Sequence, residues 1–416
     1  MIATINKKFD FIIYLSLFSI FISNIKIYIP IFAINILYVV YLIYRKELKI
    51  NLKNWNKSLV FFIIWFLINS IISIFVFKFN LNIVLGIKLI LNLTFLFFMG
   101  LIIESNNIKF KKQDFLKFLK IIILLNFIQI LVIYIKGNLI DDFLLGNLTK
   151  TSDTAYIISD FNNVIGADNK NIWASKFTLI YSIYLFTCVD EKFKNLESLR
   201  TRLIYIVMGA STILLLLSRT GQLSIIIPIL FLIFYSIKDI NKKYKNIIYG
   251  ISTAIVVVLL IVFFKKIFHI KFDITDGGYT RLLIWVKSLE NLFENNFIVG
   301  QGLSSTGYYI QNFIGRSESN LHNVFLTTLY EFGLIGLGIY IKFLYDLVKE
   351  YFNKGNYLKY IFVIAAPFMI VTNLQYLGYD NDLVVFILLI IILNKLIKEE
   401  KQDIRGNNFE YRNEYS

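Results

Sequence analysis

The side chains best suited to polar chemistry are concentrated between residues 273 and 340 of this 416-residue chain. This stretch contains Arg281, Arg316 and His322. A neutral imidazole is a usable general base near pH 7, and the planar guanidinium group of arginine suits the oxygens of a diphosphate. The combination predicts proton abstraction beside a bound phosphorylated donor, with His322 as the catalytic base.

His322 lies in the segment SESNLHNVFLTTL, where Ser319 or Asn320 is expected to cap a helix that leads into the next apolar run. A histidine in the first turn of that helix feels the positive end of the helix dipole, which lowers the pKa of the imidazole and keeps it neutral. Capping or packing is the structural alternative for a single histidine beside a membrane span. The neighbouring arginines favour the catalytic interpretation.

A third arginine, Arg219, lies in LLLLSRTGQLSIII, a short turn between two apolar runs. Its guanidinium group is expected to emerge at the outer membrane surface, either as an interfacial anchor or as a ligand of the donor. Arg219, Arg281 and Arg316 are all predicted to lie on the outer side, so they are expected to neutralise a lipid diphosphate without a metal or cofactor. The polar neighbours predicted to support this site are Ser218, Thr220 and Asn323.

Arg281 is predicted to stand in the first turn of a helix over RLLIWVKSLENLF, capped by Thr280. A cation is disfavoured at that end of a helix, so its position indicates an anionic partner. The apolar stripe of this helix is Leu282, Trp285, Val286, Leu289 and Leu292, which is expected to pack on the bundle or lie at the membrane interface. The glycine-rich segment 300–307 lacks the lysine of a nucleotide-binding loop and is interpreted as a turn.

The composition indicates a polytopic membrane protein, because 57% of the residues are hydrophobic and only 17% are charged, against ~25% charged residues in soluble domains. The net charge of +15 comes from short basic clusters between apolar runs. Such clusters orient membrane spans, so nucleic acid is not an expected partner. One cysteine and two histidines exclude a disulfide framework and a cysteine- or histidine-rich metal site.

About twelve apolar runs have the length of a transmembrane helix. They cover residues 9–25, 27–44, 59–77, 82–103, 118–136, 172–188, 203–218, 221–237, 247–264, 324–345, 359–377 and 383–397. The predicted fold is all-α, with a single transmembrane domain over residues 1–398 and a cytoplasmic polar tail over residues 399–416. The distribution of lysine and arginine places both termini in the cytoplasm. Two long extracytoplasmic loops then cover residues 137–171 and 265–323, and the second carries short helices.

Two charged features near the outer ends of the spans have simple interpretations. Lys176 is expected to extend its amine to the lipid headgroups. Asp380, Asn381 and Asp382 have the Asp-x-Asp spacing of metal-dependent glycosyltransferases. They are interpreted instead as the start of the last span, where acidic residues complement the helix dipole.

Several short motifs follow one another across residues 165–345, and their order and spacing resemble those of the O-antigen ligase and O-antigen polymerase family. The motifs are the asparagine-containing segment 169–174, SRTG at 218–221, Arg281 with Trp285, NNFIVGQG at 295–302, HN at 322–323 and LYEFGLIGLG at 329–338.

The resemblance implies a metal-independent, inverting glycosyl transfer on the outer face of the bacterial cytoplasmic membrane, from an undecaprenyl-diphosphate-linked glycan. It implies that His322 activates the acceptor hydroxyl while Arg219 and Arg281 hold the diphosphate. Arg316, in a loop that varies among such proteins, is assigned the same role by extension.

The predicted activity is that of a polymerase that joins lipid-linked oligosaccharide repeat units of an O-antigen or capsule. A ligase that moves the finished glycan to another acceptor shares this chemistry. A lipid-linked glycan flippase or a non-catalytic scaffold are the alternatives from other classes. The expected partners are membrane lipid and the chain-length regulator and flippase of the same pathway.

Overall fold

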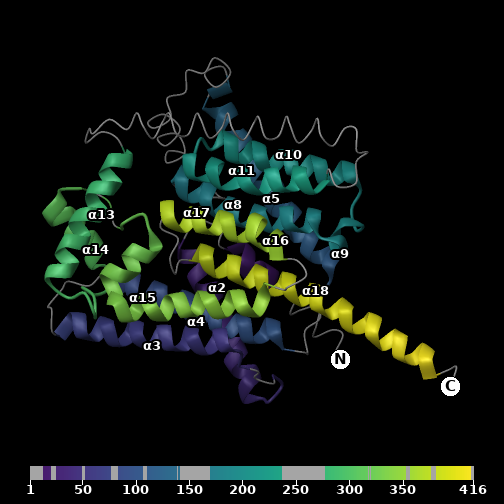
Figure 1. Cartoon of the computed structure of the whole chain (residues 1–416), viewed down its shortest axis with the longest axis horizontal. Helices are drawn as coiled ribbons and strands as arrows, with labels where there is room; N and C mark the ends of the chain where they lie inside the picture. The colour runs from purple at the N-terminus through teal and green to yellow at the C-terminus, as the bar shows by residue number, and fades with distance from the viewer. Residues whose placement is uncertain are drawn as a thin grey trace.

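The computed structural model describes residues 13–19, 25–48, 52–75, 83–105, 110–137, 139–140, 169–236, 277–316, 318, 320–352, 357–375 and 381–413. Within these ranges the chain is helical and contains no strand, which confirms the predicted all-α class. Most helices run along the long axis of the molecule (Figure 1).

The longer helices are α2 (Ile25–Tyr44), α3 (Asn54–Phe75), α4 (Ile83–Glu104), α5 (Lys112–Lys136), α8 (Lys170–Val189), α10 (Leu199–Leu215), α11 (Arg219–Ser236), α13 (Gly277–Glu294), α15 (Val324–Tyr351), α17 (Ala366–Leu374) and α18 (Asn381–Asn413). The short helices are α9 (Glu191–Lys194), α14 (Ser305–Tyr309) and α16 (Tyr357–Lys359), with two π-helices, η3 (Ile310–Ile314) and η5 (Tyr360–Ala365).

Six helices in the described part of the chain are long and apolar enough to cross a membrane, which confirms an integral membrane protein. They cover residues 54–75, 86–104, 112–136, 170–189, 324–351 and 357–374, and two shorter apolar helices cover residues 28–44 and 219–235. The predicted count of twelve stays a prediction, since the run at 247–264 and most of the run at 9–25 lie outside the described residues. The same holds for residues 141–168 of the first predicted outer loop.

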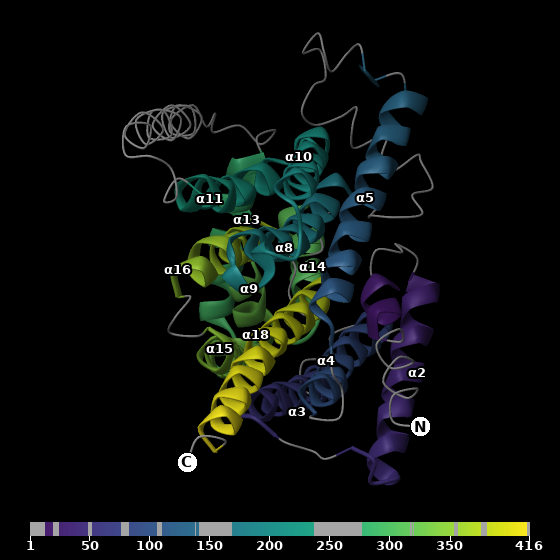
Figure 2. The ribbon, with the colours of Figure 1, turned by 90° about the vertical axis from the view of Figure 1, so that its right-hand side faces the viewer.

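Two groups of helices make up the bundle. In one, α3 packs against α4 and α15, and α4 packs against α2. The other surrounds α8, which is buried along nearly its whole length and contacts α5, α10, α11, α17 and α18. Because α18 also contacts α4, it joins the two groups, while α2 and α5 lie along one side of the bundle (Figure 2).

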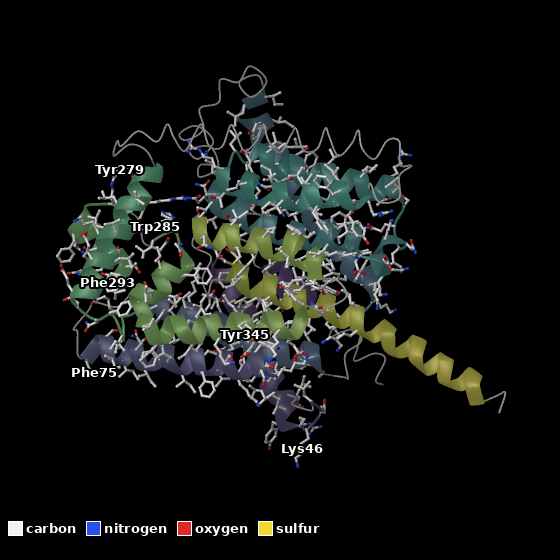
Figure 3. The ribbon with its side chains drawn as sticks, in the orientation of Figure 1. Lys46, Phe75, Tyr279, Trp285, Phe293 and Tyr345 are labelled. Carbon is white, nitrogen blue, oxygen red and sulfur yellow. The ribbon has the colours of Figure 1, made fainter. Side chains whose placement is uncertain are left out.

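One end of the bundle carries α13 and α14 (Figure 1). In Figure 3, Tyr279, Trp285 and Phe293 mark the course of α13, and Phe75 marks the end of α3 at the same end. Lys46, after α2, lies at the lower edge of this view. At the start of α3, the end away from Phe75, Lys53 Nζ lies 2.7 Å from Glu104 Oε1 and 3.0 Å from Glu350 Oε1. Ion pairs therefore tie together the helix ends that were predicted to face the cytoplasm.

The prediction that Lys176 extends to the lipid headgroups is wrong. Its side chain is only 8% exposed, and its Nζ lies 2.9 Å from Oδ1 of Asp382, whose side chain is 4% exposed. A buried amine needs a compensating charge, and the carboxylate of Asp382 in the first turn of α18 supplies one. The interpretation of Asp382 as part of a helix start is confirmed, and the acid has a partner that sequence reasoning missed.

Candidate active site

Helix α15, which follows His322, is broken within its length. Gly333 has a φ of +68° and interrupts the helix, so that two helical pieces meet at a sharp bend. The backbone N–H groups of Gln301 and Gly302 donate to the carbonyls of Tyr330 and Glu331, each at 2.8 Å. The loop between α13 and α14 thus satisfies carbonyl groups next to the bend. The predicted span over residues 324–345 is correspondingly not one continuous helix.

Only glycine fits where the loop meets the bend. Gly300 also has a positive φ, +88°, and a Cβ there would lie 2.4 Å from the backbone nitrogen of Gly333. A Cβ on Gly333 would lie 2.2 Å from the carbonyl oxygen of Ile298. Positive φ and close backbone approach are the two conditions that select glycine. The motifs at 295–302 and 329–338 are therefore two halves of one structural contact. The interpretation of 300–307 as a turn holds for 300–304, whereas residues 305–307 begin helix α14.

A buried carboxylate beside the bend fixes α14 to α15. Glu331 is 4% exposed, and its Oε1 accepts a hydrogen bond from the hydroxyl of Thr306. The backbone N–H groups of Ser304 and Thr306 also donate to this carboxylate. Sequence reasoning missed Glu331, although an acidic residue inside an apolar run is a recognisable signal.

Helix α13 begins at Gly277, earlier than predicted, so Thr280 lies inside the helix and does not cap it. Its buried face is Thr280, Ile284, Ser288 and Leu292. Two members of the predicted apolar stripe, Leu282 and Val286, are instead 51% and 46% exposed. Of the predicted stripe, Leu292 packs inward together with the polar Thr280 and Ser288, and the interfacial alternative for Leu282 and Val286 stays a prediction.

Arg281 stands one turn further into α13 than predicted, and its position has a different physical cause. Its Nη1 donates to the carbonyl oxygen of Leu374 at 2.8 Å. Leu374 is the last residue of α17, where carbonyl groups lack helical partners and carry partial negative charge. The end of one helix therefore holds the guanidinium group of another.

The charges of Arg281 and Arg219 lie close enough to repel each other. Arg281 is half-buried, and burial lowers the pKa of its guanidinium group. The positive charge of Arg219 lowers that pKa further, whereas the carboxylate of Glu318 opposes the shift. Arg219 itself is exposed at the start of α11. Two neighbouring guanidinium groups make this region strongly attractive to an anion.

Ser218 and Thr220 support Arg219 through the backbone. Ser218 is buried, and its Oγ accepts a hydrogen bond from the N–H of Gly221 at 3.4 Å. The carbonyl oxygen of the buried Thr220 accepts from Ser224 Oγ at 2.7 Å. Both residues fix the first turn of α11, and therefore the position of the backbone from which the Arg219 side chain extends.

His322 lies just before α15 and not in its first turn. Asn323 caps the helix, because its side chain accepts a hydrogen bond from the N–H of Leu326 at 3.0 Å. The predicted cap at Asn320 is wrong, since Asn320 Oδ1 accepts from the N–H of His322 itself at 2.9 Å; the other predicted cap, Ser319, lies outside the described residues. His322 adopts a φ of +52°, a conformation uncommon outside glycine.

Both neighbours of His322 are tied to the helices that surround it. Trp285 Nε1, on α13, donates to the carbonyl oxygen of Leu321 at 2.6 Å. Asn323 Nδ2 donates to Asn373 Oδ1, on α17, at 3.2 Å. The backbone of His322 is thus held between the helix that carries Arg281 and the helix whose last carbonyl binds Arg281. The role of Trp285 as a positioning residue was not predicted from the sequence.

The imidazole of His322 is held neutral, as predicted, but mainly by burial. Burial lowers its pKa, the positive charge of Arg281 lowers it further, and Glu318 opposes the shift, with a resulting pKa of about 4. The Nδ1 atom is buried without a hydrogen-bond partner.

This pKa predicts the pH dependence of the free enzyme. The neutral base is present above its pKa, so kcat/KM is expected to stay level down to mildly acidic pH and to fall as the pH passes through about 4. An acid limb near the ordinary histidine value of ~6.5 would contradict this environment. The chain has only two histidines, His269 and His322, so a His269→Asn variant permits direct NMR titration of His322.

Arg316 and Glu318 precede His322 in the same loop. Arg316 is half-buried and follows η3, where its N–H donates to the carbonyl oxygen of Ile310 at 3.2 Å. The charges that shift the pKa values of Arg281 and His322 are those of Arg219, Glu318 and Arg281, so a donor-binding role for Arg316 stays a prediction. Glu318 was missed, although an acid between Arg316 and His322 in the sequence could have indicated it.

The middle of the chain is similar to a known protein family. No curated protein matches the sequence. Residues 204–341 match the family model Wzy_C, described as O-antigen ligase. The matched region contains Arg219, Arg281 and His322 and both halves of the glycine contact. The resemblance predicted from the motifs is confirmed, because residues 204–341 of this membrane protein are similar to the O-antigen ligase family.

Proposed function

We propose that this protein is a polysaccharide polymerase of the bacterial cytoplasmic membrane. It transfers a growing O-antigen or capsule glycan from undecaprenyl diphosphate to the next lipid-linked repeat unit. The observation that carries the proposal is the meeting of two mutually repelling guanidinium groups with a neutral, half-buried imidazole at one end of the bundle. This arrangement suits a diphosphate donor and a hydroxyl acceptor.

The proposed reaction is a single displacement at the anomeric carbon. An acceptor hydroxyl gives its proton to His322 Nε2 while its oxygen forms the new glycosidic bond. The bond to the diphosphate oxygen breaks from the opposite face, which inverts the configuration. The electron pair leaves with undecaprenyl diphosphate, and Arg219 and Arg281 stabilise the charge that develops there. Since a neutralised diphosphate is a good leaving group, the arginines make a separate acid or metal unnecessary.

Glu318 has a role after proton transfer. Once His322 becomes an imidazolium, its charge is repelled by Arg281 and attracted by Glu318, the two charges that already act on this ring. One carboxylate oxygen of Glu318 is buried without a hydrogen-bond partner. The acid can therefore stabilise the protonated base until the proton leaves.

The site is assigned to the extracytoplasmic side. The end of α17 and the starts of α11 and α15 meet at the site, and the opposite end carries the lysine-rich segments predicted to be cytoplasmic. A lipid-linked donor of this kind is available to an outer-face enzyme after a flippase has delivered it. The flippase and the chain-length regulator of the pathway are the proposed partners.

A ligase is the second candidate, and the description of the matched family favours it. It shares the donor and the base and differs only in the acceptor. The heavy use of Ile, Asn, Lys and Phe favours the polymerase, because AT-rich composition is common in bacteria that lack lipid A.

The test is the glycan profile of a deletion strain complemented with the wild-type protein, by gel ladder and mass spectrometry. A polymerase is expected to convert single lipid-linked repeat units into long chains. Accumulation of long lipid-linked chains in the deletion strain would identify a ligase. Repeat units trapped on the cytoplasmic side would identify a transporter and refute the catalytic assignment.

A further inference from the structure

An apolar groove of about 310 Å³ lies between α15, η5, α17 and α18. Its size falls within the ~300–1,000 Å³ range of ligand pockets. The groove is open to the outside of the bundle, because four of its lining side chains are between 39% and 59% exposed: Ile341, Tyr345, Val348 and Met369.

The groove leads to the candidate active site along two of its walls. On one wall, Phe325 belongs to the first turn of α15, directly after the helix cap at Asn323. On the other, Met369 precedes Asn373 by one turn of α17, and its carbonyl oxygen accepts from Asn373 Nδ2 at 2.8 Å. The next residue, Leu374, holds Arg281. A ligand whose charged head lies at Arg281 can therefore extend an apolar tail into this groove.

The bend at Gly333 brings Phe325 back beside the second piece of α15. The rings of Phe325 and Tyr340 lie 6.2 Å apart between centroids, although fifteen positions separate them in the sequence. In a straight helix that separation would exceed ~20 Å at 1.5 Å per residue. The same break that docks the glycine loop therefore places the top of the groove next to the base.

A π-helix shapes the far wall. Segment η5 ends at Ala365, which is the smallest side chain among those that line the groove. π-Helical turns inside α-helices are rare and often mark functional sites. The wall is hollow at Ala365, and a larger side chain there would fill the groove without touching the charged residues of the active site.

We propose that this groove binds the polyprenyl chain of the lipid-diphosphate donor and makes transfer dependent on the length of that chain. The inference rests on the proposed function and assigns the apolar half of the same substrate. The isoprene units next to the diphosphate lie between α15 and α17, and the remainder of the chain continues into the bilayer. Phospholipid acyl chains are the competing occupant.

The test compares two synthetic donors that carry the same glycan diphosphate on a long and on a short polyprenyl chain. The full-length protein is assayed in lipid nanodiscs as wild type, Ala365→Phe and the milder Ala365→Leu. Ala365→Phe is expected to lower kcat/KM for the long donor about tenfold, chiefly through KM, while the short donor changes by less than about threefold; a tenfold change corresponds to ~1.4 kcal/mol. Activity with the short donor also shows that the variant is folded.

Ile34→Phe is the matched control, because Ile34 is 66% exposed on α2 and does not line the groove. This substitution should leave kcat/KM unchanged for both donors. If Ala365→Phe lowers kcat/KM equally for both donors, or for neither donor, the groove assignment is overturned. Loss of bound phospholipid in native mass spectrometry without any change in donor kinetics would assign the groove to phospholipid and overturn it as well. If the wild-type protein transfers the glycan from neither donor, the proposed function fails independently of the groove.

Discussion

Replacing His322 by alanine is expected to abolish chain extension while donor binding is retained. General bases contribute ~10²- to 10⁴-fold to a rate, so a loss of this size in kcat is expected with little change in the donor Kd. The imidazole is neutral at physiological pH and adds no charge to the diphosphate site. The measurement is the transfer rate of purified protein, together with the glycan ladder of complemented cells at equal membrane abundance.

His322→Gln tests the proton transfer more sharply. Glutamine retains hydrogen bonding but cannot accept a proton near neutral pH, so it should be as inactive as alanine. The matched control is His269→Ala, which removes the other histidine of the chain. Normal polymer from His322→Ala at wild-type abundance would leave the base without a role and would favour the scaffold alternative.

The side chains that lie at the candidate site could be predicted from the sequence, whereas the reason for their positions could not. Arg219, Arg281 and His322 span just over one hundred positions of the sequence, and in the structure the charge of Arg219 acts on Arg281 and the charge of Arg281 acts on His322. The prediction that these side chains lie at one site was based on their residue types and their order along the chain. The local geometry differs from the prediction at the helix caps, at the break in α15 and at Lys176, because contacts with residues far away in the sequence determine it.

The helix caps show why local rules failed. Asn320 and Asn323 have the same capping preference, and the sequence does not distinguish them. The ties from Trp285 to Leu321 and from Asn323 to Asn373 fix the chain so that Asn323 is the cap. Helix start signals describe the helix alone, and these contacts involve two other helices.

The break at Gly333 and the buried Lys176 show the same limit for membrane spans. Hydropathy treats residues 324–345 as a continuous apolar run, and the contact that interrupts it comes from the loop at Gly300. Lys176 near a span end favours a headgroup contact until Asp382 of another helix is known to lie beside it. Partners far away in sequence leave no periodic signal in either segment.

Replacing Arg281 by alanine is expected to impair both donor binding and the chemical step. Removing one group that stabilises transition-state charge typically costs ~10²- to 10³-fold in kcat, and the loss of a diphosphate contact should raise the donor KM as well. Arg281→Lys is expected to restore little. A single ammonium group lacks the fork that lets one arginine nitrogen bind the carbonyl of Leu374 while the other faces the donor.

The control for charge loss is Arg200→Ala, because Arg200 is exposed at the start of α10, the end of that helix away from Arg219. Arg200→Ala should leave kcat and the donor KM unchanged.

The two central predictions can be separated by the titration of His322. The positive charge of Arg281 lowers the pKa of His322, so Arg281→Ala should raise that pKa toward its ordinary value and move the acid limb to higher pH. The control variant Arg200→Ala should not move it, and Glu318→Gln should move it in the opposite direction, since the carboxylate opposes the shift. An Arg281→Ala protein that is inactive but leaves the His322 pKa unchanged would show that the arginine and the histidine do not share one site. If the pKa rises and transfer is lost together, the guanidinium group that binds the donor is also the one that keeps the base ready to accept a proton.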